Sequence, residues 1–496
     1  MPGQVIRVEF PAQGYVNPIN TTFEFDVSLQ GYGTAGSQCV RFQNNIQSIF
    51  NRVRLLYGAT PLEDIIQYNV VVRALTEWTS TNQLGTIDQT SIAEGIGGVT
   101  VGLGGTGLGY STALLATAGG STLVNVRQAY IHGIDATATT NFGSVPNTQG
   151  AVGSTTGLPI RRYQVNLALG LLTQDKLIPV KFMASQLAIE LSLAPEVECI
   201  IATTAGTGNG PTYQVTNFNM IPEILEFDAS YGKWLLLTPL IDAMFLKGLQ
   251  DGGVPIKFSS WHTFIFSTAS AANVNLLVQE RSRSVKALFA VQRRSPGSYF
   301  ADHGALFFST SATSVLAHTM QNYQFRIGGR YFPAQPVQLS TTIGSAYSNG
   351  GAEAYVELQK ALNMVGDYRL STGANVLRWA ASDTTLNAAS TSFATTGENE
   401  TDYAYYPIKR ATAGYPTYQG AVLPGAGNVG SVCYASAVDL ETSNGVEISG
   451  LNAEEQSDIA FIANWSAAQA QYNLEVYSYY DAMIILRANN VLELIQ

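Results

Sequence analysis

Alternation of apolar and polar residues with a period of two is the main pattern along the chain. It is clearest at residues 23–29, at residues 163–167 with an extension through Leu169 and Leu171, and at residues 187–193. Such alternation is typical of a strand with one buried and one wet face. Weaker alternation predicts further strands at residues 5–10, 51–57, 213–218, 256–266, 285–292, 323–327 and 472–486. The pattern therefore predicts an all-β chain.

Long stretches rich in Gly, Ser, Thr and Ala separate these strands. They cover residues 95–120, 137–157, 203–210, 341–351 and 380–401. Loops of this length are uncommon in compact domains and are usually either functional or unstructured. We expect loops that extend from a rigid β scaffold toward neighbouring molecules. Helices and strands do not alternate along the sequence, which disfavours a doubly wound α/β enzyme.

Two helices carry clear sequence signals. Thr60, Pro61 and Glu63 match a capping box with Pro at the first helical position, which predicts a helix from Thr60 onward. Its apolar face would contain Ile65, Tyr68, Val72 and Leu75. A second helix is predicted from Thr238–Pro239 to Leu249, followed by two glycines.

The second helix lies near the midpoint of the chain. Residues 1–250 contain 12 Lys and Arg against 17 Asp and Glu, and residues 251–496 contain 14 against 19, so each half has a net charge of −5. The balanced halves predict an N-terminal β domain at residues 1–237, a connecting helix at 238–253 and a C-terminal β domain at 254–496.

The composition is poor in charged residues. Asp, Glu, Lys and Arg make up 12% of the chain, against roughly 25% in typical soluble domains. A monomer with so few charges is weakly protected from self-association, so we expect much of the surface to be buried against copies of the same chain. The net charge of −10 and the absence of a basic arm argue against specific nucleic-acid binding.

Cysteine content and hydropathy exclude several other classes. The three cysteines, Cys39, Cys199 and Cys433, are far apart, so neither a disulfide framework nor a CxxC metal site is predicted, and we expect buried free thiols. The N-terminal residues lack the features of a signal peptide. The most apolar stretch, residues 234–249, contains Pro239, Asp242 and Lys247, so no transmembrane segment is expected.

No catalytic or cofactor motif is convincing. None of the four histidines, His132, His262, His303 and His318, forms an HxH or HExxH pair, although the fold could still assemble a His-based metal site or a Ser-His-Asp triad. Carboxylates cluster at Glu63–Asp64, Glu196/Glu198 and Glu398/Glu400/Asp402, where solvated loop charges are the simpler interpretation. The GxGxxG match at residues 102–107 lies in a Gly-rich stretch without the acidic residue that a dinucleotide site needs. We expect no enzyme, cofactor or metal site.

One stretch concentrates positive charge. Arg281, Arg283, Lys286, Arg293 and Arg294 fall within 14 residues, beside a strand pattern at residues 285–292. A solvated strand edge is the default interpretation of these charges. The alternative is a contact with a partner or with the inner surface of an assembly, for which Arg281, Arg283, Arg293 and Arg294 are the candidates.

Three stretches, in their order along the chain, together resemble a known family. They are QNNIQSIFNRVRLLYG at residues 43–58, LGLLTQDKLIPV at 169–180, and IKFSSW at 256–261 followed by SVKALF at 284–289. The chain resembles the double jelly-roll major capsid proteins of polinton-like viruses and virophages, which are relatives of the large eukaryotic DNA viruses.

This resemblance implies two consecutive eight-stranded jelly rolls with a few short helices and long loops. It implies a structural subunit of the virion, made in the host cell without a signal peptide. Three chains would form a pseudo-hexameric capsomer that tiles an icosahedral capsid around double-stranded DNA. Its partners would be neighbouring capsomers and penton and minor capsid proteins. Two alternatives stay open: a β-sandwich carbohydrate-active hydrolase that uses paired carboxylates, and a viral spike or minor vertex protein.

Overall fold

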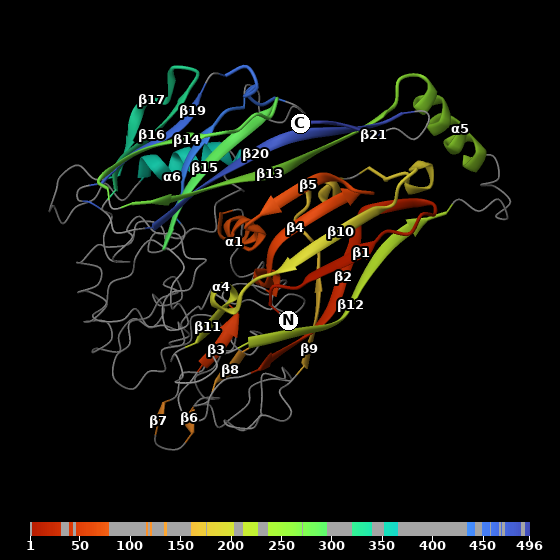
Figure 1. Ribbon diagram of the computed structural model, residues 1–496, viewed down its shortest axis with the longest axis horizontal. Helices are drawn as coiled ribbons and strands as arrows, with labels where there is room; N and C mark the ends of the chain where they lie inside the picture. The colour runs from red at the N-terminus through yellow and green to blue at the C-terminus, as the bar shows by residue number, and fades with distance from the viewer. Residues whose placement is uncertain are drawn as a thin grey trace.

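The computed structural model of the chain describes two groups of antiparallel sheets. The described residues are 2–30, 39–42, 46–78, 116–117, 120–121, 133–135, 160–174, 176–202, 212–226, 237–269, 271–294, 320–339, 352–365, 434–441, 449–456, 458–465, 468, 472–487 and 492–496. We call the strands before residue 226 the first unit and those after residue 253 the second unit. Figure 1 shows the two units side by side.

The first unit is built on two antiparallel sheets. One has the order β1–β10–β4–β5, with bounds Val5–Glu9, Leu187–Leu193, Phe50–Tyr57 and Thr60–Ile66. The other has the order β12–β2–β9, with bounds Thr212–Leu225, Tyr15–Gln30 and Ile160–Val165. The ring of Phe25 on β2 lies 5.7 Å from that of Phe50 on β4, so the two sheets share one core.

Two smaller sheets complete the described strands of the first unit. One has the order β11–β3–β8, with bounds Ile200–Ala202, Cys39–Phe42 and Gly133–Asp135. The other pairs β6 with β7, at Ala116–Thr117 and Gly120–Ser121.

The second unit has the same two-sheet construction. One sheet has the order β13–β20–β15–β18, at Val254–Thr268, Tyr472–Leu486, Val285–Arg294 and Ser436–Asp439, and β21, at Leu492–Ile495, also pairs with β20. The other has the order β14–β19–β16–β17, at Asn273–Val278, Ile459–Trp465, Met320–Ile327 and Arg330–Gln338. The Tyr323 hydroxyl on β16 donates to the Ala437 carbonyl on β18 at 3.1 Å and links the sheets.

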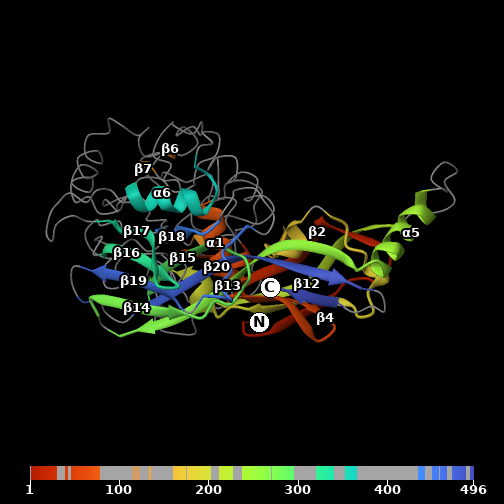
Figure 2. The same ribbon diagram turned by 90° about the horizontal axis from the view of Figure 1, so that it is seen from above.

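Short helices fill the connections between these strands. They are η1 Ile46–Ile49, α1 Tyr68–Trp78, α3 Gly170–Thr173, η5 Val180–Phe182, α4 Glu196–Cys199, α5 Leu237–Gln250 and α6 Ala352–Ala361. Figures 1 and 2 show α5 at one end of the molecule, beyond the ends of the sheets. Its Phe245 ring packs against Tyr15 and Phe182, with centroid distances of 5.2 and 6.3 Å. In the described part of the chain, every strand pairs only with strands on its own side of α5.

Most of the predicted elements are present. The strands predicted at residues 187–193 and 472–486 coincide with β10 and β20, and the predicted midpoint helix corresponds to α5. Cys199 is a buried free thiol, as expected, while the side chains of Cys39 and Cys433 lie outside the described residues. The predicted loops at 137–157, 203–210, 341–351 and 380–401, and the GxGxxG stretch, also lie outside them.

The capping-box prediction was wrong. Thr60–Ile66 is strand β5, not the first turns of a helix, and helix α1 begins only at Tyr68. The reason is a hairpin: Tyr57 pairs with Thr60 across a tight turn in which Gly58 takes a φ of 58°, a conformation that glycine adopts without strain. The sheet hydrogen bonds to β4 outweigh the local helix signal. Glu63 therefore points into the protein instead of capping a helix.

The extension of strand 163–167 was also wrong. Strand β9 ends at Val165, and Leu171 lies in helix α3, with Leu169 as the residue before it. Both leucines are buried, so the alternation that predicted a strand came from apolar residues that a short helix buries equally well.

Candidate functional site

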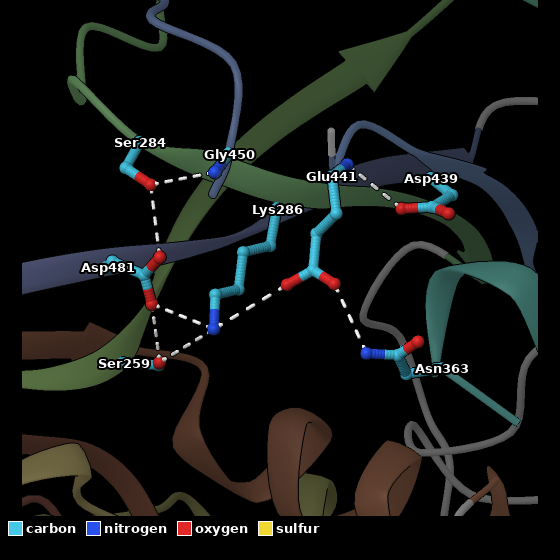
Figure 3. Close-up of polar contacts among 8 residues, drawn as sticks. All are labelled: Ser259, Ser284, Lys286, Asn363, Asp439, Glu441, Gly450 and Asp481. Carbon is cyan, nitrogen blue, oxygen red and sulfur yellow. Dashed lines mark hydrogen bonds and ion pairs between the residues drawn. The ribbon is translucent and has the colours of Figure 1, made fainter. Parts of the chain in front are cut away.

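A buried ion network surrounds the lysine of the basic stretch. Lys286 Nζ lies 2.9 Å from Asp481 Oδ1 and 3.5 Å from Glu441 Oε1 (Figure 3). The three side chains are 17%, 7% and 10% exposed, respectively. Figure 3 shows the lysine reaching between the two carboxylates, which come from opposite sides of it. One cation therefore joins strand β15, strand β20 and the segment after β18.

Hydroxyl and amide groups complete this network. Ser259 Oγ on β13 donates to Asp481 Oδ1 at 2.7 Å, and Ser284 Oγ donates to Asp481 Oδ2 at 3.0 Å. The backbone N–H of Gly450 in turn donates to Ser284 Oγ at 3.0 Å. Asn363, just after α6, donates to Glu441 Oε2 at 3.2 Å. With both oxygens of each carboxylate engaged, the network is held in one arrangement.

A β-bulge places Lys286 in this position. Val285 pairs with Tyr480 and Ala287 pairs with Tyr479, so Lys286 is an extra residue in strand β15. An extra residue interrupts the ladder and redirects a side chain. The Lys286 carbonyl accepts a hydrogen bond from the Leu440 N–H at 2.7 Å, which fixes the backbone of the bulge to the end of β18.

The amine in this network is a fixed cation. Burial acts to lower the pKa of Lys286, but the hydrogen bond and charge of Asp481, together with the charges of Tyr479 and Glu441, outweigh burial and raise the pKa. A protonated amine is neither a nucleophile nor a general base. The arrangement therefore cross-links strands and does no covalent chemistry.

A second cluster contains the residue types of a catalytic triad. His262 Nδ1 lies 3.3 Å from both carboxylate oxygens of Glu280 and 3.5 Å from Ser282 Oγ. In a working triad the acid and the serine occupy different ring nitrogens. Here both face Nδ1, and Ser282 Oγ donates to Glu280 Oε1 at 2.7 Å. Ser282 and Glu280 are 3% and 2% exposed, and the triad geometry is not met.

The carboxylate pairs from the sequence do not converge on a cleft. Glu63 and Asp64 point to opposite sides of β5: Glu63 is buried, while Asp64 accepts two hydrogen bonds from Arg52. Glu196 accepts from Thr212 Oγ1 at 3.0 Å, and Glu198 accepts from Asn51 Nδ2 at 2.7 Å. The cluster Glu398/Glu400/Asp402 lies outside the described residues.

Glu63 instead connects the two units. Its carboxylate accepts hydrogen bonds from the N–H groups of Gly170 and Leu171 at 2.8 and 2.7 Å, and from Ser260 Oγ of β13 at 2.8 Å. Glu63 is 1% exposed. Burial raises its pKa to about 7, and the hydrogen bonds from Leu171, Ser260 and Gly170 oppose that shift.

The candidate arginines are described only in part. Arg283 Nε lies 2.7 Å from Glu454 Oε2, with side chains 59% and 53% exposed. Arg281 Nη1 donates to the Gln456 carbonyl at 3.4 Å and is also exposed. The backbones of Arg293 and Arg294 pair with β20, but their side chains lie outside the described residues. Arg281 and Arg283 thus lie on one exposed surface, next to an acidic residue that offsets part of their charge.

Two features are absent from the described residues. These residues contain no group of three or more His, Cys, Asp or Glu side chains that could hold a metal ion. No helix among them is both long and apolar enough to cross a membrane.

The sequence did not single out the two acids of the Lys286 network. Asp481 interrupts the apolar and aromatic run of strand β20, and an ionised residue there requires a buried partner. That requirement was a usable signal. Glu441 gave no such signal, because it follows a short strand and its partners are distant in sequence.

Comparison of the sequence with protein-family models and with curated proteins gives no match. The fold, however, matches solved structures over nearly the whole chain. The mavirus major capsid protein is 10% identical, with 99% of this chain and 86% of that chain covered and a TM-score of 0.50. The Faustovirus major capsid protein is 9% identical, with coverages of 98% and 88% and a TM-score of 0.50.

A third similar structure is VP54 of PBCV-1, fitted into a reconstruction of the virophage Sputnik. It is 9% identical, with 100% of this chain and 93% of that chain covered and a TM-score of 0.50. Both units are therefore included in the similarity. The chain has the double jelly-roll fold of these capsid proteins, and the predicted fold class is confirmed.

Proposed function

We propose that the chain is a major capsid protein, a non-enzymatic structural subunit of an icosahedral virion that encloses double-stranded DNA. The observation that carries this proposal is the similarity of the entire chain, through both units, to the mavirus and Faustovirus major capsid proteins. A β-sandwich unit alone is compatible with many functions. Two consecutive jelly rolls in one chain are a far more restrictive arrangement.

The proposal includes the division of the chain. An N-terminal jelly roll at residues 1–237 is joined by a helix at 238–253 to a C-terminal jelly roll at 254–496. The pairing of the described strands, which never crosses α5, supports this division. A ring of three such chains contains six jelly rolls. Because the two jelly rolls of a chain are similar in shape, a trimer with threefold symmetry has an approximately hexagonal outline. We infer a homotrimer that contacts neighbouring capsomers and penton and minor capsid proteins.

The low content of charged residues supports burial of the outer surfaces of each chain against neighbouring chains in such an assembly. Only 12% of the residues are charged. Large interfaces between subunits exclude unpaired ions, because burying a charge without a partner is costly. Lys286 follows this rule, since it has two carboxylates as partners.

The proposal assigns Arg281 and Arg283 to a contact with a partner or with the inner surface of the shell, together with Arg293 and Arg294. The exposure of Arg283 supports this assignment. Because the chain is acidic overall, specific DNA binding is not part of it. Replacing Arg281 and Arg283 with Ser should lower the yield of assembled shells and leave the capsomer intact.

Electron microscopy of the purified full chain tests the proposal. We expect particles with a hexagonal outline and threefold symmetry in negative stain. Uniform particles the size of one chain would contradict it.

A further inference from the structure

The contact between the two units contains an acidic group without a cation. Glu63 belongs to strand β5 of the first unit, and Ser260, which donates to it, belongs to β13 of the second. Among the described residues, the donors to the Glu63 carboxylate are two backbone N–H groups and one hydroxyl. No described lysine or arginine forms an ion pair with it.

The described residues around Glu63 offer no other compensation for its charge. Tyr480 on β20 interacts electrostatically with Glu63. Burial and then the charges of Glu63, Glu280 and Asp64 raise the pKa of the Tyr480 phenol. Asp64 is paired with Arg52, and helix α3 presents only backbone to Glu63. The described ionisable groups around Glu63 are therefore neutral or acidic, apart from Arg52, which is paired with Asp64, and His262, which stacks on Tyr480 and contacts Glu280.

The contact around Glu63 is tight. A Cβ atom on Gly170 would lie 2.0 Å from the carbonyl oxygen of Ser259, so backbone of the first unit touches backbone of the second at this point. Glu63 is 1% exposed, so its carboxyl is shielded from bulk solvent. Any separation of the units at this contact would expose the Glu63 carboxyl to water.

We propose that the Glu63 carboxyl is a proton-operated latch between the two units, which hold together more firmly when it is protonated than when it is ionised. Ionised Glu63 has a buried charge with no cation among the described residues, and opening of the contact returns that charge to water. When Glu63 is protonated, no buried charge favours opening of the contact.

The direction of the pH effect follows from linkage. The pKa of Glu63 is raised by burial from 4.5 to about 7 in the closed state, so the closed state binds the proton more tightly than the open state. The stabilisation is fully present below pH 4.5 and is lost as the pH rises through 7. Between these values the equilibrium constant for opening rises about tenfold per pH unit.

Hydrogen–deuterium exchange of the full chain tests this latch. Peptides that contain α3 and the centre of β13 report the contact, and peptides from β10 report the core of the first unit. After correction for the intrinsic exchange rate, we expect the contact peptides to open at least tenfold more readily at pH 8 than at pH 5.5, with no matching change in β10. Equal protection at both pH values would overturn the proposal.

Variants separate the latch from general pH effects. Glu63→Gln stays neutral, so its contact peptides should show no such pH dependence. Glu9→Gln removes an exposed carboxylate from the same sheet and should behave as the parent chain. Ser260→Ala removes a hydrogen bond that lowers the pKa of Glu63, so the midpoint of opening should move to higher pH. A pH dependence retained in Glu63→Gln, or an unchanged midpoint in Ser260→Ala, would contradict the proposal.

The latch acts within one chain and does not depend on the proposed role in a capsid. Its failure in these experiments would leave that role standing, and a monomeric chain could still have the latch. If the chain does form a shell, subunits with ionised Glu63 should make the shell easier to open above neutral pH.

Discussion

Trp78, the last residue of helix α1, stacks on Phe289 of strand β15, with ring centroids 5.3 Å apart and planes inclined by 21°. Both residues are buried, at 1% and 0% exposure. The helix belongs to the first unit and the strand to the second. An aromatic pair thus joins the two jelly rolls through their apolar surfaces, as Glu63 and Ser260 join them through polar groups.

Replacing Trp78 with Ala should destabilise the chain by about 3–5 kcal/mol, because it removes a large buried ring and leaves a cavity at the contact between the units. Chemical denaturation of the purified chain measures this change. Tyr331→Ala is the matched control: the residue is 48% exposed, and loss of its ring should cost less than about 0.5 kcal/mol. A loss below about 1 kcal/mol for Trp78→Ala would show that the stacking does not hold the units together.

Gly170→Ala should strain the same contact from the backbone side. The added methyl group would lie 2.0 Å from the Ser259 carbonyl oxygen, so the two units must move apart. We expect a loss of at least about 1–3 kcal/mol in unfolding free energy. Gly248→Ala on α5 is the control, because its methyl group would meet only Val254 Cγ2, at 3.2 Å, and the change should stay within about 1 kcal/mol. Equal effects of the two substitutions would contradict the close approach at Gly170.

Lys286→Met should leave Asp481 and Glu441 as buried acids without their cation. The expected loss is about 2–4 kcal/mol, somewhat reduced because the lysine side chain is 17% exposed. Arg283→Met removes an exposed ion pair with Glu454 and should cost less than about 1 kcal/mol. Thermal unfolding of both variants at pH 7 gives the comparison. A Lys286 variant as stable as the Arg283 variant would mean that the network contributes nothing to stability.

Glu280 predicts an acid-dependent loss of stability. Burial acts to raise its pKa, but the hydrogen bond and charge of His262 and the hydroxyl of Ser282 outweigh burial and lower the pKa to about 2. Because the folded-state pKa lies below the ordinary 4.5, the stabilisation is fully present above pH 4.5 and is lost as the pH falls through 2.

Glu280→Gln should therefore lose about 3 kcal/mol at neutral pH and should show a flatter decline in stability between pH 4.5 and 2. Denaturation curves measured across this range test both effects. Glu454→Gln, with a side chain that is 53% exposed, should keep the decline of the parent chain. An unchanged decline in Glu280→Gln would show that another group causes it.

The sequence predicted the fold where its pattern was regular. The alternation in strand β10 and the proline near the start of α5 are local signals, and both elements lie where they were expected. Glu63 shows the limit of such reasoning. Its position after Thr60 and Pro61 favours a helix locally, but hydrogen bonds to the neighbouring strand β4 decide the outcome.

The polar contacts between distant segments could not be predicted from the sequence. Lys286 and Asp481 are 195 residues apart, and only the bulge at Lys286 and the pairing of β15 with β20 bring them together. Glu63 and Ser260 are 197 residues apart and lie in different units. No local pattern encodes either contact, because each depends on how whole sheets pack.

The mass of the purified chain at nanomolar concentration tests the central claim most directly. The proposed capsid tile contains three copies, and their interfaces should survive dilution, because obligate interfaces are large and apolar. Mass photometry should therefore give one species of about three times the chain mass of 53.1 kDa. A single species at the mass of one chain would contradict the account.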